Sequence, residues 1–267
     1  MLLRDGDQPI VTAYDRNGTL RFKTNLSIPG VDRLLVRDLA ASANSTVAAA
    51  VSAMNSAGQV AAAIVWIDPA GRILKVVRTS PFGSYHIAFT SDGHLWAVGR
   101  VYDSRFEEVS SYDVVRQYDA NGDSVRTALP RTTFAIKRPP ASSSFLIASP
   151  DRVGFYSIAA AEFIELSLSG DVIGRWPLAP LPVDIRITGA ALTTTNDVFL
   201  SAQRLQTVAN SPQSALPNRL LYRLDVLSGA LIPVTIPAAT KTGVLIGSDD
   251  ENLVFGSSSG VSWFLVK

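Results

Sequence analysis

The sequence contains no cysteine and only two histidines among its 267 residues. Without cysteine there can be no disulfide framework, zinc knuckle, iron–sulfur cluster or thiol nucleophile. Two histidines leave little room for an imidazole-based metal site or a serine–histidine–aspartate triad. Composition alone therefore removes most of the common catalytic and metal-binding arrangements.

Charge is also scarce, and it is balanced. Charged residues make up 18% of the chain, against roughly 25% in typical soluble domains. The 24 Lys and Arg nearly cancel the 23 Asp and Glu, so the formal net charge is +1. We expect no nucleic-acid partner, because attraction to a polyanion needs a basic excess. With 47% hydrophobic residues, a chain of this length can bury a globular core.

The longest uncharged stretch, Leu39–Ile67, is long enough to cross a membrane. Polar residues interrupt it throughout, and Asn55–Gly58 in its middle has the composition of a turn. We therefore expect a hairpin of two strands, Val47–Met54 and Val60–Ile67, and no insertion into a membrane. The start of the sequence, Met1–Asp7, carries acids where a signal peptide needs an apolar run, so we expect no leader there.

Two turn patterns alternate along the chain. The first has Asp or Ser at the start of a turn and Gly three or four residues later, between apolar strands. The Asp or Ser side chain closes such a turn by a hydrogen bond to the backbone, and Gly adopts the positive φ that the turn requires. The glycines of this series are Gly18, Gly71, Gly122, Gly170 and Gly229, at steps of 53, 51, 48 and 59 residues.

The second pattern is an apolar strand, Ser or Thr, a polar turn and another apolar strand, at 41–47, 90–96, 148–153, 194–198 and 247–253. Two hairpins per period of about 53 residues give four strands per unit, and no segment sustains a helical pattern. Four-stranded units repeated radially are typical of a β-propeller. We predict an all-β fold, with residues 1–267 forming a single β-propeller domain of four-stranded blades.

The number of blades stays open. The chain begins with a hairpin of the first kind, near 9–26, and ends with one of the second kind, near 243–256, followed by the apolar strand Val261–Val266. Joining the terminal hairpins would complete a fifth blade and cover exposed sheet edges. The last strand is then surplus, so the alternatives are five blades or a shortened six-bladed propeller.

One hairpin of each kind points to a known class of propeller. Thr90–Val98 resembles the inner-hairpin signature of NHL-like, six-bladed propeller repeats, also seen in gluconolactonase-type propellers. Tyr118–Gly122, followed by Val125 and Leu129–Pro130, is similar to the outer hairpin of the same repeats. The resemblance extends weakly over the whole chain and implies a scaffold rather than a reaction. Similar propellers are often exported, which favours a periplasmic or secreted location over the cytoplasm.

Gluconolactonase-type members bind a divalent metal through carboxylates near the mouth of the central channel, but this sequence departs from that pattern. The segments that lead into inner strands share one face of a propeller. Here each supplies a cation and only two supply carboxylates, so we expect no metal and no cofactor. A ring of cations would instead favour an anion. The candidate ligand-binding residues are Arg33, Arg37, His86, Arg138, Asp184, Arg186 and Lys241. In the alternative interpretation, Arg33 pairs with Asp32 and Arg186 with Asp184.

Two connections, Arg100–Asp113 and Gln203–Asn218, are longer than tight turns, and propeller topology predicts them on the same face as the cations. Polar loops on a rigid scaffold often carry recognition. In the first loop we expect contacts from Tyr102, Arg105, Phe106, Glu107 and Glu108, unless the loop is only a variable insertion.

The predicted function is that of a non-catalytic binding or scaffold propeller, which recognises a protein, a glycan or a small anionic ligand at its loop-rich face. We expect a monomer, and we assign no catalytic residue. The alternative is a gluconolactonase-like hydrolase at the channel mouth, with His86 and Asp184 as its acid–base pair. The G-x-S-x-G pattern at Gly256–Gly260 does not support a serine hydrolase, because it lies between apolar strands and not at a strand-to-helix turn.

Overall fold

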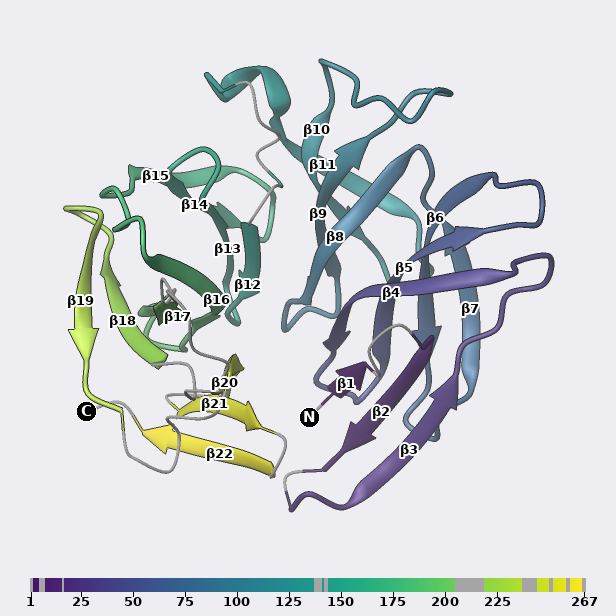
Figure 1. Ribbon diagram of the computed structural model, residues 1–267, viewed down its shortest axis with the longest axis horizontal. Helices are drawn as coiled ribbons and strands as arrows, with labels where there is room; N and C mark the ends of the chain where they lie inside the picture. Colours follow the sequence, from purple (N-terminus) through teal and green to yellow (C-terminus); the bar gives the residue numbers. More distant parts are fainter. Residues whose placement is uncertain are drawn as a thin grey trace, which may run out of the picture.

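The computed structural model describes residues 2–4, 8–15, 17–136, 141, 144–204, 219–236, 244–249, 252–257 and 260–265. Apart from one turn of 3-10 helix at Arg131–Thr133, every regular element in this part of the chain is a β-strand. The strands form six antiparallel sheets arranged around a common centre (Figure 1). The predicted all-β propeller is confirmed. In the described ranges no helix is long and apolar enough to span a membrane.

We number the sheets as blades 1 to 6 in chain order. Blades 2 to 5 have four strands each, and blades 1 and 6 have three. The first strands of blades 2 to 6 contact one another in turn, so they lie innermost. Blade 1 contains β1 (Leu2–Arg4), β2 (Ile10–Tyr14) and β3 (Leu20–Asn25); blade 2 contains β4 (Arg33–Ala41), β5 (Val47–Met54), β6 (Val60–Ile67) and β7 (Ile73–Arg78); blade 3 contains β8 (Phe82–Phe89), β9 (Leu95–Val101), β10 (Asp113–Tyr118) and β11 (Ser124–Pro130). Blade 4 contains β12 (Ser144–Ala148), β13 (Arg152–Ser157), β14 (Glu162–Ser167) and β15 (Val172–Pro177); blade 5 contains β16 (Ile185–Leu192), β17 (Val198–Arg204), β18 (Arg219–Asp225) and β19 (Ala230–Val234); blade 6 contains β20 (Val244–Asp249), β21 (Asn252–Ser257) and β22 (Gly260–Leu265).

The hydrophobic core is divided among the spaces between blades. Five clusters of buried side chains each join residues of two neighbouring blades. On β5, Val47, Ala49 and Val51 belong to the cluster shared with blade 1, whereas Ala48 and Ala50 belong to the cluster shared with blade 3. Both faces of this strand are covered, which is why it reads as a continuous apolar run instead of an alternating one. Each sheet therefore depends on its neighbours to bury its faces.

The terminal hairpins do not combine into one blade. In blade 1 the turn at Asp15–Gly18 joins β2 to β3, just as the turn at Asp68–Gly71 joins the third and fourth strands of blade 2. Blade 1 thus has the outer three strands of a complete blade. Blade 6 has the inner three, since β20 and β21 form the inner hairpin and β22 follows. The described residues form the six sheets of the shortened six-bladed alternative, and within them the two ends do not share one blade as the five-bladed alternative requires.

The predicted Asp-to-Gly turns are present at the blade tips. At Asp119 the carboxylate accepts hydrogen bonds from the backbone N of Asp123, at 2.9 Å, and of Asn121, at 2.8 Å. These bonds, led by the one from Asp123, lower the pKa of the carboxyl group. Gly122 closes the turn with a φ of 84°.

Close packing of blades 1 and 2 predicts unequal effects for the same substitution in two such turns. Gly18 and Gly71 both have positive φ, so alanine at either position should cost about 1 kcal/mol in backbone strain. A β-carbon on Gly71 would lie 2.7 Å from Cβ of Phe22, whereas one on Gly18 would meet nothing within 4 Å. We expect Gly71→Ala to lower the free energy of unfolding by about 2 kcal/mol in urea titration, and Gly18→Ala by about half of that. Equal losses would contradict the close approach of the two blades.

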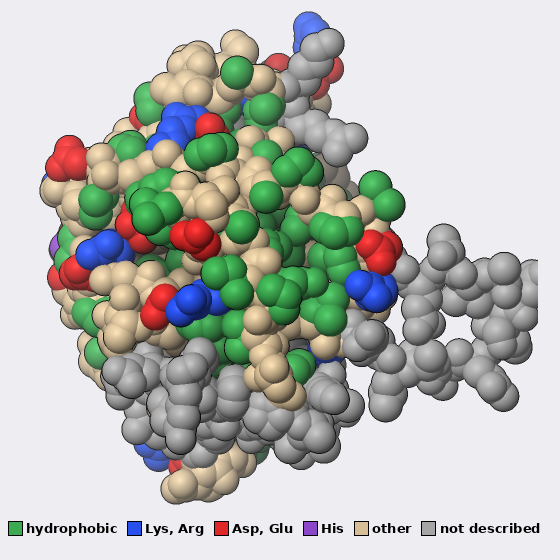
Figure 2. Space-filling model, turned by 90° about the vertical axis from the view of Figure 1, so that its left-hand side faces the viewer, with side chains coloured by type: hydrophobic (Ala, Val, Ile, Leu, Met, Phe, Trp, Pro, Cys, Tyr) green, Lys and Arg blue, Asp and Glu red, His purple; other side chains and the backbone are tan. Residues whose placement is uncertain are grey.

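The outermost strands expose apolar side chains among charges of both signs. Figure 2 shows this on the side where β15, β18 and β19 reach the surface, at the left of Figure 1. Val172 and Ile173 on β15 are each 52% exposed. In this view, basic side chains (Lys and Arg) and acidic side chains (Asp and Glu) are scattered among the apolar ones, in keeping with the net charge of +1.

Candidate functional site

A cleft with a volume of about 490 Å³ lies between blades 2 and 3. Blade 2 contributes residues of β4 to β7 and the connection Ser80–Pro81, and blade 3 contributes the start of β8 and the loop after β9. These are segments of the face on which propeller topology predicts the long connections. The volume is in the range of about 300–1,000 Å³ that is usual for small-molecule sites. The side chains that matter below are Arg37, Arg78, Ser84, Tyr85, Tyr102 and Phe106, all of which line the cleft.

Two β-bulges contribute side chains to the cleft. The pairing of β4 with β5 shifts between Val36 and Asp38, so Arg37 is an extra residue on the innermost strand of blade 2. The pairing of β8 with β9 shifts in the same way around Tyr85. A bulge bends the strand and redirects the side chain of the extra residue. Nε of Arg37 donates a hydrogen bond to Oγ of Ser52 on β5, at 2.9 Å.

Tyrosine side chains from blade 3 form one wall. The hydroxyl groups of Tyr85 and Tyr102 are hydrogen-bonded to each other. The guanidinium of Arg100 lies 4.9 Å from the centre of the Tyr85 ring, and the backbone N of Tyr102 donates to the carbonyl of Pro81 at 3.0 Å. Burial, followed by the hydrogen bond to Tyr85, raises the pKa of Tyr102 to about 12. Its phenol therefore stays neutral at physiological pH.

A polar network holds the loop between β9 and β10, which carries Tyr102. The hydroxyl of Tyr112 donates to Oε1 of Glu108 at 2.5 Å. Nε of Arg131 lies 3.5 Å from the same carboxylate and Nη1 of Arg100 lies 4.0 Å from it. These three charged side chains are only 13–20% exposed. Burial, followed by the bond to Glu108, raises the pKa of Tyr112. A network of this kind gives the loop one fixed conformation.

The tip of the same loop repeats the Asp-to-Gly turn with a different final residue. The carboxylate of Asp103 accepts hydrogen bonds from the backbone N of Arg105, at 2.8 Å, and of Glu107, at 2.9 Å. Phe106 occupies the position that Gly18 or Gly122 has in the other turns, with a φ of 61°. The side chain is 54% exposed at the edge of the cleft. Positive φ is unfavourable for a bulky residue.

Ser84 supplies a polar group with no partner. The residue is 6% exposed and lines the cleft, and within the described part of the chain its Oγ makes no hydrogen bond. A buried hydroxyl without a partner costs about 1–3 kcal/mol, so such a group calls for an explanation. With two arginines and two phenol hydroxyls among its lining residues, the cleft can bind a small anion through charge and hydrogen bonds. No group of three or more His, Cys, Asp or Glu side chains in the described ranges could hold a metal ion.

The predicted ring of cations is only partly represented at this cleft. Arg37 lines it, whereas Arg33 lies exposed at the start of β4 and Arg186 lies exposed on β16 in blade 5. Asp184 forms an ion pair with Arg204, at 3.1 Å, and not the pair with Arg186 that the sequence suggested. Among the described residues Arg33 makes no ion pair with Asp32. The predicted residues Arg138 and Lys241 lie outside the described ranges.

His86 contacts a different acid from the one expected. Its Nδ1 lies 3.4 Å from Oδ2 of Asp38 on β4, and its ring lies 5.8 Å from that of Phe145 on β12. The same Asp38 oxygen accepts a hydrogen bond from the backbone N of Ile87 at 2.9 Å. Asp184 precedes β16 in blade 5, with blade 4 between it and His86. The expected pairing of His86 with Asp184 is therefore replaced by an interaction with Asp38 that links blades 2 and 3.

The sequence analysis did not single out Arg78 or Ser84, and it did not predict that Arg37 and Tyr85 line the same cleft. One signal was available for Arg37 and Tyr85. Positions 37 and 85 differ by 48 residues, close to one repeat, so they occupy the same place in consecutive blades. Nothing comparable marks Ser84, because its importance lies in a missing hydrogen bond.

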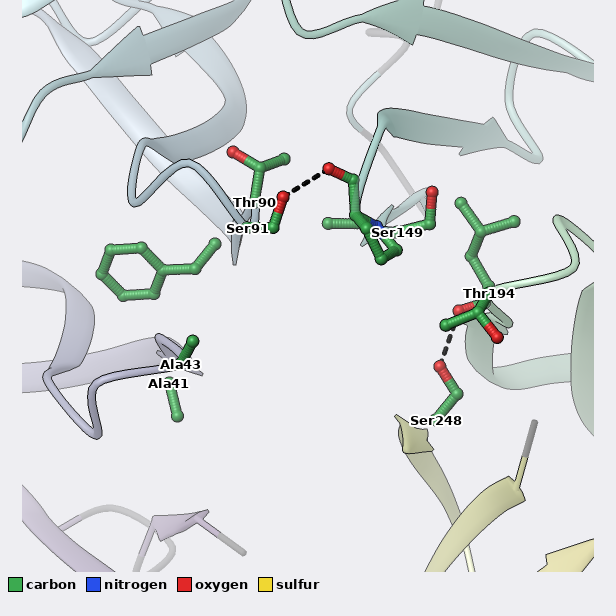
Figure 3. Close-up of a pocket in the computed structure, with 11 residues that line it drawn as sticks. Ala41, Ala43, Thr90, Ser91, Ser149, Thr194 and Ser248 are labelled. Atoms are coloured by element: carbon green, nitrogen blue, oxygen red, sulfur yellow. Dashed lines mark hydrogen bonds between the residues drawn. The ribbon is translucent and has the colours of Figure 1, made fainter. Parts of the chain in front are cut away.

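A smaller hollow of about 240 Å³ lies where the inner hairpin turns of five blades meet, at the other end of the innermost strands (Figure 3). Hydroxyl side chains line it, and three of them, Ser91, Ser149 and Ser248, form hydrogen bonds to a neighbouring blade. Oγ of Ser91 donates to the carbonyl of Pro150 at 2.5 Å, and Oγ of Ser248 donates to that of Leu192 at 2.6 Å (Figure 3). Among the described residues no charged side chain lines this hollow, so the cleft between blades 2 and 3 is the better candidate site.

Comparison with known proteins gives the fold and no family. No family model matches the chain, and no curated protein matches its sequence. A protein of unknown function from Bacteroides caccae has a similar structure, with a TM-score of 0.54 and 11% identity over 95% of this chain and 81% of its own. Virginiamycin B lyase from Staphylococcus aureus aligns over 99% and 94% of the two chains, with a TM-score of 0.49 and 13% identity. A gluconolactonase from Xanthomonas campestris aligns over 86% and 88%, with a TM-score of 0.46 and 11% identity. At these identities the likeness extends to the fold alone, and the chain is a β-propeller.

Proposed function

We propose that this propeller is a non-catalytic binding protein that takes a small anionic ligand in the cleft between blades 2 and 3. The observation that carries the proposal is that Arg37 and Arg78 line one cleft, which is also lined by Ser84 with its unpartnered hydroxyl. Guanidinium groups bind carboxylates and phosphates through paired hydrogen bonds. Of the three predicted partner classes, a small anion fits a cleft of about 490 Å³ best.

The charge balance of the lining supports an anion over a cation. Of the described residues that line the cleft, Asp103 is the one acid. Its carboxylate already accepts two backbone hydrogen bonds within the loop turn. The lining therefore contains two guanidinium groups and one carboxylate, and the hydrogen-bonding capacity of that carboxylate is partly used.

The gluconolactonase-like hydrolase is the weaker candidate. It depends on His86, and the carboxylate in contact with His86 is that of Asp38. The hydrogen bond from Ile87 gives Asp38 a structural role between β4 and β8. An acid–base role for this pair has no second observation in its favour.

The proposal predicts that anion binding depends on two particular arginines. We expect acetate and sulfate to bind with millimolar dissociation constants in calorimetric titration, and the double variant Arg37→Ala/Arg78→Ala to bind them at least about tenfold more weakly. Arg33→Ala is the matched control, because Arg33 is an exposed arginine of the same strand, β4, that does not line the cleft. It should change affinity by less than about twofold.

The same titration separates the cleft from the wider ring of cations. If Arg33→Ala and Arg186→Ala weakened binding as much as the double variant does, the anion would be bound by the ring. An unchanged affinity in Arg37→Ala/Arg78→Ala would reject the cleft as the site.

A further inference from the structure

We infer that the ligand of this cleft is an aryl carboxylate, a small molecule that carries an aromatic ring and a carboxylate group. The inference rests on the proposed function and specifies its ligand. Anion binding alone would account for the two arginines. It would leave the remaining lining of the cleft without a role, and that lining has two features that indicate a ring.

The first feature is the aromatic and apolar character of the lining. Tyr85, Tyr102 and Phe106 line the cleft together with Val60 and Pro81. The bond between the two tyrosine hydroxyls and the contact of Arg100 with the Tyr85 ring fix this wall before any ligand arrives. Aromatic side chains favour stacked or edge-on contacts with another ring. A ligand with no apolar part would leave this surface in contact with water.

The second feature is the conformation of Phe106. In turns with the same hydrogen bonds, at Asp15 and Asp119, the corresponding residue is glycine. Phe106 adopts positive φ at a position where glycine is favoured, and its side chain is 54% exposed, so packing in the folded chain does not explain the choice. Strained residues of this kind concentrate at ligand-binding sites. Contact with a bound ring gives the phenyl group a role.

The polar end of the ligand is matched as well. The planar fork of a guanidinium group suits the two oxygens of a carboxylate. Arg37 and Arg78 come from the first and last strands of blade 2, and Ser84 comes from the first strand of blade 3. The hydroxyl of Ser84 would gain its missing hydrogen bond by donating to a carboxylate oxygen.

The test compares three carboxylates by isothermal titration calorimetry on the full chain: 3-phenylpropanoate, its cyclohexyl analogue and acetate. We expect 3-phenylpropanoate to bind at least about tenfold more tightly than acetate, and more tightly than the cyclohexyl analogue. The tripeptide Gly-Gly-Phe presents the same ring and carboxylate at the end of a peptide. If the tripeptide bound and the free acid did not, the assignment of a small-molecule ligand would be overturned.

Two variants distinguish a ligand-binding role from a structural one. Phe106→Gly removes the ring and relaxes the turn, and Ser84→Ala removes a hydroxyl that has no partner. We expect neither variant to lower the thermal midpoint of the wild type by more than about 3 °C, because each removes an unfavourable feature of the folded chain. We expect Phe106→Gly to weaken 3-phenylpropanoate binding at least about fivefold, and to weaken it more than it weakens acetate binding. Ser84→Ala should weaken both ligands. Unchanged binding in both variants would overturn the inference.

The anion site and the aryl character of its ligand can be disproved separately. If acetate and 3-phenylpropanoate bound equally well, and both depended on Arg37, the aryl assignment would fall and the anion site would stand. If no carboxylate bound, or if binding did not depend on Arg37, both would fall.

Discussion

Replacing Glu108 with alanine is expected to lower the free energy of unfolding by about 3 kcal/mol and to abolish detectable ligand binding. The carboxylate is shared by Tyr112, Arg131 and Arg100, whose side chains are largely buried around it. Removing one partner from such a group destabilises by about 3–5 kcal/mol, and the remaining exposure of the charged side chains places the effect at the lower end. Binding should be lost with it, because the loop that carries Tyr102 and Phe106 loses its main anchor.

Glu107 provides the matched control for this substitution. It is the adjacent residue in the same loop, and its side chain is exposed. Glu107→Ala should change stability by less than about 0.5 kcal/mol and leave binding intact. Glu108→Gln keeps an acceptor for the Tyr112 hydroxyl but removes the charge, so it should be intermediate. Urea titrations and calorimetry measure both effects, and equal stability of Glu107→Ala and Glu108→Ala would show that the network does not hold the loop.

Alkaline solution should destabilise the fold between about pH 10 and pH 12. Burial raises the pKa of Tyr156 to about 12, and burial with the Tyr85 hydrogen bond raises that of Tyr102 to about 12 as well. In the unfolded chain a tyrosine titrates near pH 10. A raised folded pKa means that the stabilisation is complete below pH 10 and is lost as the pH rises through 12. For Tyr156, which is 1% exposed, the loss amounts to about 2–3 kcal/mol.

The variant Tyr156→Phe isolates this contribution. It has no ionisable hydroxyl, so its free energy of unfolding should fall by about 2 kcal/mol less than that of the wild type between pH 10 and pH 12. Denaturant titrations at a series of alkaline pH values provide the measurement. Parallel curves for the two proteins would mean that Tyr156 is not held in its neutral form by burial.

Much of the fold could be predicted from local signals. The turns at Gly18, Gly71 and Gly122 need positive φ, and this requirement left a regular glycine series in the sequence. The continuous apolar runs of β5 and β6 identified strands covered on both faces. These properties depend on residues a few positions apart, so composition and spacing record them.

The ends of the chain were harder, because sheet membership depends on pairing partners. β1 has only three residues, Leu2–Arg4, and its short sequence gives no alternating pattern to recognise. Its pairing with β2 gives blade 1 a third strand, and the pairing of β22 with β21 does the same for blade 6. Spacing of turns alone could not separate two incomplete blades from one shared blade.

The candidate site was predictable only as a face of the molecule. Arg37 and the loop with Tyr102 and Phe106, which topology predicted on one face, line the same cleft. Which cations share a cleft depends on the bulges at Arg37 and Tyr85, and a bulge has no reliable signature in a single sequence. The turn at Phe106 was missed because its final residue is not glycine, although its Asp103 makes the usual hydrogen bonds.

The most direct test of the cleft as the binding site is a crystal structure of the protein soaked with 3-(4-iodophenyl)propanoate, the iodinated form of 3-phenylpropanoate. The anomalous signal of the iodine gives the position of the ring without reference to the surrounding density. We predict a single strong peak between blades 2 and 3, beside Tyr102 and Phe106, with the carboxylate directed to Arg37 and Arg78. A peak in the hollow formed by the inner hairpin turns, with no peak in the cleft, would contradict the central claim.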